Sequence, residues 1–101
     1  MPTVNLTCHA DRTELAFRGA LDVSDARAAY EALNEALLRT LPLELHGAEM
    51  TRLDGAGLQL LAVFCRGAKE RGLMYQWRST GSPLLAAAAS AGLTQTLELP
   101  T

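Results

Sequence analysis

The feature that most limits how this chain can fold is a set of helix-length segments, each ending at a residue that helices disfavour. In the first segment, apolar residues recur at steps of three and four, as on one face of an amphipathic helix. Proline disfavours helical geometry in the residue before it, and glycine commonly follows a helix C-terminus. Helices are therefore predicted over 24–40 before Pro42, from about 54–57 to Arg71 before Gly72, and over 82–91 before Gly92.

The starts of the first and third helices carry typical capping residues. Ser24 and Ser82 are the predicted N-caps, because a serine hydroxyl accepts a hydrogen bond from a free N–H of the first turn. Pro83 fits the first turn of the third helix, where its missing N–H costs nothing.

Short strands are predicted before the first helix and between the helices. Strands are predicted over Val4–Cys8, Glu14–Arg18, Leu43–His46 and Leu73–Arg78. The first two form a hairpin that ends at Gly19, a loop follows over 47–52, and the tail Leu93–Leu99 forms a short strand, helix or turn. The order β-β-α-β-α-β-α predicts an α/β fold, with a mixed sheet flanked by helices and right-handed crossovers.

Composition excludes several classes of protein. A chain of 101 residues with 49% hydrophobic residues has room for one domain with one core. Its net charge of −2 gives no reason to expect nucleic acid or an anionic membrane as a partner. No signal-peptide or membrane-spanning pattern is present, and the two cysteines lie far apart. A cytoplasmic protein with free thiols is expected.

The sequence offers no catalytic, metal or cofactor site. A metal site would require Cys8, His9, His46 and Cys65 to converge, and their spacing fits no ligand motif. A dinucleotide motif starting at Gly55 would need a glycine at Leu60, and no G-x-S-x-G elbow exists. A small-ligand site along the second helix would need convergent polar groups that the sequence does not supply. We therefore expect no enzyme activity and no cofactor.

The opening of the second helix, Asp54 to Leu58, stands out. Asp54 can cap the helix, and the side-chain-poor residues Gly55, Ala56 and Gly57 leave its backbone approachable. One interpretation is a tight joint that must clear a neighbouring strand. The other is a surface that a second polypeptide covers.

Several segments and the order of elements together resemble a STAS domain, the fold of bacterial anti-sigma factor antagonists. The segments are Gly19–Val23, Leu43–Gly47, Leu53–Leu58, Ser82–Pro83 and Leu84–Leu93. The resemblance covers nearly the whole chain and implies a single STAS-like domain over 1–101.

In that family the start of the second helix faces the partner protein. In typical antagonists it is Asp-Ser-Ser-Gly, and an anti-sigma kinase phosphorylates the second serine. The matching residue here is Ala56, preceded by Gly55, and neither has a hydroxyl group. A phosphate there would add about −2 charge and expel a partner from an apolar contact. The resemblance therefore implies a module that is not phosphorylated at this position.

Two subgroups of the family tolerate this change. One is the MlaB-like small subunit of lipid-trafficking ABC transporters, in which Asp-Thr-Ala-Gly contacts the ATPase; here Gly55 replaces the threonine. The other is the single-domain STAS proteins of chemotaxis or sensory signalling, which Asp54–Leu61 resembles closely. We favour the second.

The resemblance thus implies a non-enzymatic protein–protein interaction module of bacterial signalling. Its expected partner is a sensory, chemotaxis or anti-sigma component, with an ABC transporter ATPase as the alternative. Whether the domain forms a homodimer stays open. The expected partner-binding residues are Ser24, Thr51, Arg52, Asp54, Gly55, Ala56, Gly57 and Leu58.

Overall fold

The structure, a computed structural model, describes residues 3–21 and 26–100. Within these residues four strands and three helices follow one another in the predicted order. The elements are β1 (Val4–Cys8), β2 (Thr13–Leu21), α1 (Ala26–Leu38), β3 (Leu43–Leu53), α2 (Gly55–Glu70), β4 (Tyr75–Ser79) and α3 (Ser82–Ala91). The expected α/β fold is confirmed.

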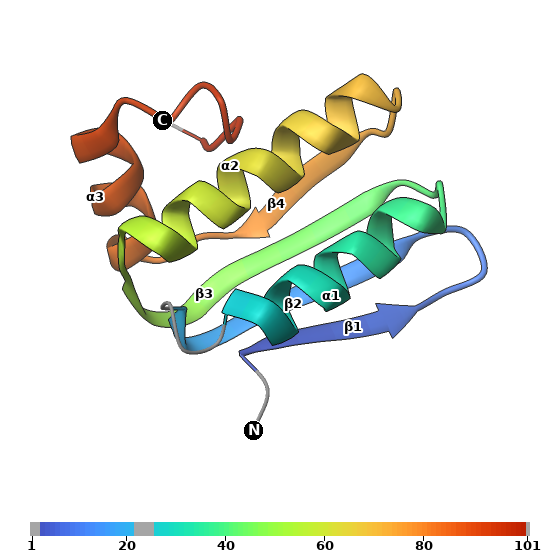
Figure 1. Cartoon of the computed structure of the whole chain (residues 1–101), viewed down its shortest axis with the longest axis horizontal. Coiled ribbons are helices and arrows are strands. Elements are labelled where there is room, and N and C mark those ends of the chain that lie inside the picture. Colours follow the sequence, from blue (N-terminus) through green and yellow to red (C-terminus); the bar gives the residue numbers. More distant parts are fainter. Residues whose placement is uncertain (1–2, 22–25, 101) are drawn as a thin grey trace.

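The four strands form one sheet in the order β1-β2-β3-β4. β1 runs antiparallel to β2, whereas β2, β3 and β4 are parallel to one another. Parallel neighbours require a crossover connection, and α1 and α2 provide the two crossovers. These helices lie side by side across one face of the sheet, and α3 packs against β3 at the end of the molecule where α2 begins (Figure 1).

The two faces of the sheet differ in chemistry, because successive side chains on a strand point to opposite faces. The strand side chains that face the helices are buried, among them Leu15, Phe17, Leu43, Leu45 and Trp77. They belong to one apolar cluster with the inner sides of α1 and α2. The alternate positions Glu14, Glu44 and His46 lie on the other, open face and are half-buried.

β3 is longer than predicted: it extends to Leu53, so the expected loop over 47–52 is wrong. Gly47 lies within the strand because α3 packs closely over it. A Cβ atom at Gly47 would come within 2.9 Å of Leu84 Cδ2 and 3.2 Å of Trp77 Cζ3. The glycine therefore marks a close approach of two elements rather than a turn.

β2 also extends beyond its predicted end. Gly19 does not end the hairpin: it adopts a φ of +73° inside the strand, next to an irregularity in the pairing with β3. A positive φ is readily available to glycine, which lets the strand continue to Leu21. β4 begins at Tyr75 rather than Leu73, because the Leu73 N–H closes the end of α2 by bonding the Ala68 carbonyl.

The structure corrects one of the two predicted serine caps and does not describe the other. Gly81, not Ser82, is the N-cap of α3, and its extended backbone leads directly into Ser82 and Pro83 in the first turn. Ser24, the predicted cap of the first helix, lies outside the described residues. The predicted ends at Gly72 and Gly92 are confirmed, since both glycines have a φ of +70°.

The C-terminal tail forms turns rather than a strand, and it closes the core beside β4. Leu97 and Leu99 are buried. The Trp77 indole Nε1 donates a hydrogen bond of 2.9 Å to the Leu97 carbonyl, which fixes the tail against the sheet. Among the described residues, no helix is long and apolar enough to cross a membrane.

Candidate functional site

The first turn of α2 is held by its capping residue. Asp54 has an extended backbone, and its carboxylate accepts a hydrogen bond of 2.8 Å from the Gly57 N–H. The Asp54 carbonyl accepts a second bond, of 2.9 Å, from the Leu58 N–H. The first bond satisfies a backbone donor that a helix start otherwise leaves free, and the second is the first regular i→i−4 bond of the helix, so the turn has a defined geometry. The predicted role of Asp54 as the N-cap is confirmed.

The inner side of this turn packs against the end of β2. A Cβ atom at Gly57 would overlap the Leu21 carbonyl oxygen and would lie 2.9 Å from Leu53 Cδ1. Leu58 is buried in the core. Both residues were expected to contact a partner, but the chain's own strands cover them. They fix the position of the turn and are not part of its accessible surface.

The outer side of the turn is open. Gly55 and Ala56 are exposed, and a Cβ atom at Gly55 would meet no atom within 4 Å. Thr51 and Arg52, in the last residues of β3, are also exposed. We call Gly55 and Ala56 the outer turn. Ser24 lies outside the described residues. Of the expected binding residues that the structure describes, the accessible ones are therefore the outer turn with Thr51 and Arg52, while Asp54 is half-buried.

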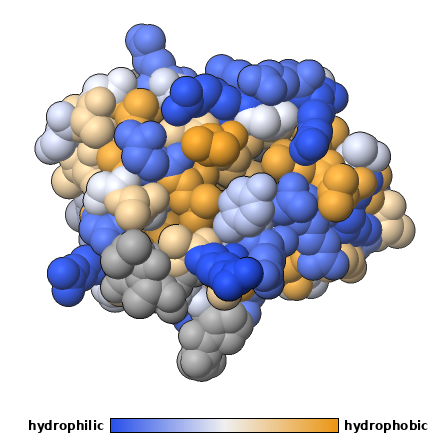
Figure 2. Space-filling view, viewed as in Figure 1, coloured by the Kyte–Doolittle hydropathy of each residue, from blue (hydrophilic) through white to orange (hydrophobic). Residues whose placement is uncertain are grey.

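Further along α2 than the outer turn there is an apolar groove. The groove lies between α1 and α2 and has a volume of about 230 Å³. Apolar side chains gather along it in the space-filling view (Figure 2). Tyr30 and Val63 at its edges are each 55% exposed.

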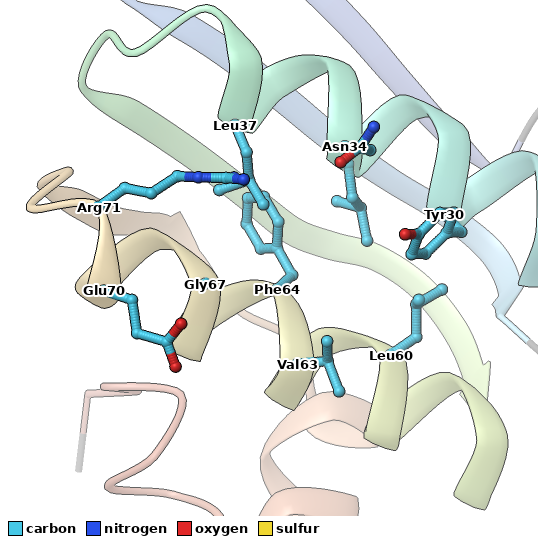
Figure 3. Close-up of a pocket in the computed structure, with 10 residues that line it drawn as sticks. Tyr30, Asn34, Leu37, Leu60, Val63, Phe64, Gly67, Glu70 and Arg71 are labelled. Carbon is cyan, nitrogen blue, oxygen red and sulfur yellow. The ribbon is translucent and has the colours of Figure 1, made fainter.

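Side chains of the two helices meet across this groove. Leu37 of α1 and the Phe64 ring of α2 lie close together at its floor, and Arg71 extends over one end toward Leu37 (Figure 3). Asn34 is a polar residue on the α1 side. The periodicity of the first segment predicted one apolar face for α1. It could not show that α1 and α2 stand far enough apart to leave an open channel.

Two titratable groups packed beneath α2, the Cys65 thiol and the Tyr75 hydroxyl, are unreactive at neutral pH. Burial raises the pKa of the Cys65 thiol to about 12. Burial also raises the pKa of the Tyr75 hydroxyl, which donates a hydrogen bond to the Thr96 carbonyl. A thiol that stays protonated at neutral pH is a poor nucleophile, so this pair stabilises the core rather than forming a reactive site.

Potential metal ligands come together at a different place from the one tested in the sequence. In the described part of the chain, one group of three such residues has ligand atoms within 4.8 Å of one another, and it consists of Glu14, Glu44 and His46. Neither Cys8 nor Cys65 belongs to it. The sequence signal was the pair Glu44 and His46 on one face of a strand, but its third member is on a neighbouring strand.

Known proteins resemble this chain in structure, but none was matched by sequence. No protein-family model matches the chain. No curated protein matches it in sequence. An anti-sigma factor antagonist from Mycobacterium paratuberculosis superposes with a TM-score of 0.75 at 19% identity, covering 93% of this chain and 80% of that one. The unphosphorylated anti-sigma factor antagonist SpoIIAA gives a TM-score of 0.74 at 12% identity, covering 91% and 83%.

The chain has a STAS fold. A further solved structure, Mglu, is 26% identical with a TM-score of 0.66, and the match covers 75% of this chain. The present chain spans only 19% of that structure, so the match concerns a small part of Mglu. At these identities the superpositions establish the fold.

Proposed function

We propose that this chain is a non-enzymatic STAS-type interaction module of bacterial signalling, and that a partner protein docks on the outer turn of α2. The observation that carries the proposal is the environment of Gly55. No packing contact and no positive φ requires a glycine there, yet the turn carries almost no side chain on its accessible side. A partner can therefore approach the backbone closely.

The neighbouring surface fits a protein partner. Beyond Ala56, the exposed side of α2 carries Gln59 and then the apolar Val63, while Arg52 supplies a charge at the rim. An apolar centre with a polar edge is the usual composition of a protein interface. The partner is a cytoplasmic sensory or chemotaxis component, and docking does not respond to phosphorylation at Ala56, which has no hydroxyl group.

Site-specific photo-crosslinking in the native bacterium tests this proposal. A photoreactive residue replaces Ala56 in one strain and, as a matched control, the exposed Ala10 of the β1–β2 turn in another. The start of α2 and the β1–β2 turn lie at opposite ends of the molecule (Figure 1). We expect a discrete crosslinked protein from position 56 only. Equal crosslinking at both positions, or none at position 56, would refute docking on the outer turn.

The identity of the crosslinked protein separates the favoured function from its alternative. Asp54, Ala56 and Gly57 also match the Asp-x-Ala-Gly stretch of MlaB-like subunits, so an ABC transporter ATPase is the second candidate partner. Mass spectrometry of the adduct distinguishes a signalling protein from an ATPase. An ATPase would replace the signalling role with that of a transporter regulator while leaving the docking surface unchanged.

A further inference from the structure

We propose that the open face of the sheet carries a site for a divalent transition-metal ion, with zinc as the best fit, formed by Glu14, Glu44 and His46. This site lies on the opposite side of the sheet from the helices and is independent of docking at the outer turn. Its three ligands come from two parallel strands that the fold places side by side.

The strand register brings the ligands together. Glu14 of β2 pairs directly with Glu44 of β3, and His46 lies two residues further along β3, opposite Ala16. Side chains two residues apart on a strand share a face, so all three point to the open face. The His46 Nε2 atom lies 4.0 Å from Glu14 Oε2 and 3.9 Å from Glu44 Oε2.

These distances suit a shared ion. Zinc binds imidazole nitrogen and carboxylate oxygen at about 2.0–2.2 Å, so two ligands of one zinc ion lie about 3–4 Å apart. The His46 Nε2 atom is shielded from solvent and has no hydrogen-bond partner, although the whole side chain is 34% exposed. A ring nitrogen that faces two carboxylates without a bond of its own is an available ligand.

A further histidine contacts one of the ligands without belonging to the group. His9, in the β1–β2 turn, lies with its Nε2 atom 3.2 Å from Glu14 Oε1. This contact can orient the Glu14 carboxylate. One imidazole and two carboxylates make a nitrogen–oxygen set that suits zinc, nickel or copper better than magnesium or calcium.

The charges on the open face of the sheet also favour a bound cation. Glu14 and Glu44 are like charges at paired positions, which is unfavourable without a cation. Arg12 lies 2.9 Å from Glu44 Oε1 and Arg78 lies 3.7 Å from the same oxygen, which leaves Oε2 turned toward His46. Glu14 has imidazoles as its partners, and these are neutral when unprotonated. A bound divalent ion gives Glu14 a cationic partner and joins β2 to β3.

Titration of tag-free, chelator-treated protein with zinc chloride tests the site by calorimetry and thermal unfolding. We expect one ion per chain and a rise in Tm of about 10 °C when zinc exceeds its Kd a hundredfold. His46→Gln and Glu14→Gln are each expected to weaken binding by more than about 100-fold, because each removes a ligand. His9→Gln is expected to weaken it by about tenfold.

Two control variants define specificity. Asp11→Asn removes an exposed carboxylate that pairs with Arg12 outside the cluster, and Cys8→Ser removes the thiol next to His9. Both are expected to bind zinc as the unaltered chain does. Nitrogen NMR of the unaltered protein gives an independent readout, in which zinc shifts the His46 imidazole resonances. No saturable binding up to millimolar zinc, unchanged affinity in His46→Gln, or unshifted His46 resonances would each overturn the proposal.

Discussion

One side of α2 packs against the sheet and the other is open, and two glycines in its first turn show the difference most clearly. Gly57, on the inner side, lies where any side chain would overlap the backbone of β2. Gly55, two residues earlier, faces open space. Packing explains the first glycine completely and the second not at all. A side-chain-poor residue is therefore evidence for a binding surface only where the fold does not itself require it.

The largest expected effect comes from Gly57→Ala. The added methyl group meets the Leu21 carbonyl, which belongs to the backbone and cannot rotate away, so we expect a loss of about 3 kcal/mol in the free energy of unfolding. Urea denaturation measures it. The control is Gly55→Ala, expected to be neutral or stabilising by about 0.5 kcal/mol. Equal effects at the two positions would remove the distinction between the two sides of the turn.

High pH tests the inner side further along the helix. Burial raises the pKa of Cys65 from 9.0 to about 12. Below pH 9.0 the thiol is protonated in both the folded and unfolded states. Above it the unfolded state alone ionises, so folding stability falls as pH rises toward 12, by at most about 1.4 kcal/mol per pH unit from this group.

Denaturation at several alkaline pH values measures this decline. Cys65→Ala is expected to have a shallower slope between pH 9 and 11 than the unaltered chain. Its slope is not zero, because burial raises the pKa of Tyr75 as well. Identical slopes in the two proteins would mean that Cys65 is not buried as the structure has it.

A smaller effect is expected from Asp54→Ala, which removes the bond to the Gly57 N–H at the boundary between the two sides. Loss of an N-cap side chain costs about 1 kcal/mol in the free energy of unfolding. Thermal unfolding should detect it, with Asp54→Asn, which keeps a capping oxygen, losing less. If Asp54→Asn loses as much as Asp54→Ala, the cap bond is not what holds the turn.

Local sequence signals predicted α2 better than the elements around it. The Asp54 cap and the Gly72 terminus are short-range features, and both are as expected. β3 was predicted too short because Gly47 resembles a turn residue unless the packing of Leu84 above it is known. The burial of Leu58 likewise depends on where β2 ends, which the sequence alone does not reveal.

The open face of the sheet was the least predictable region. Glu14 and Glu44 are 30 positions apart in the chain, and only the pairing of β2 with β3 brings them together. The spacing of cysteines and histidines along the chain points to His46 but to neither carboxylate. Strand register is a long-range property, and a ligand set that depends on it requires the fold.

The most direct test of the account is the affinity of the crosslinked partner for Ala56→Glu, measured by calorimetry with purified proteins. A glutamate on the outer turn brings an unpaired charge into the interface, whereas Ala10→Glu places the same charge on an exposed turn at the other end of the molecule. With unchanged circular dichroism for both variants, the account predicts about a 100-fold loss of affinity for Ala56→Glu and less than about a twofold change for Ala10→Glu. Full affinity in Ala56→Glu would contradict it.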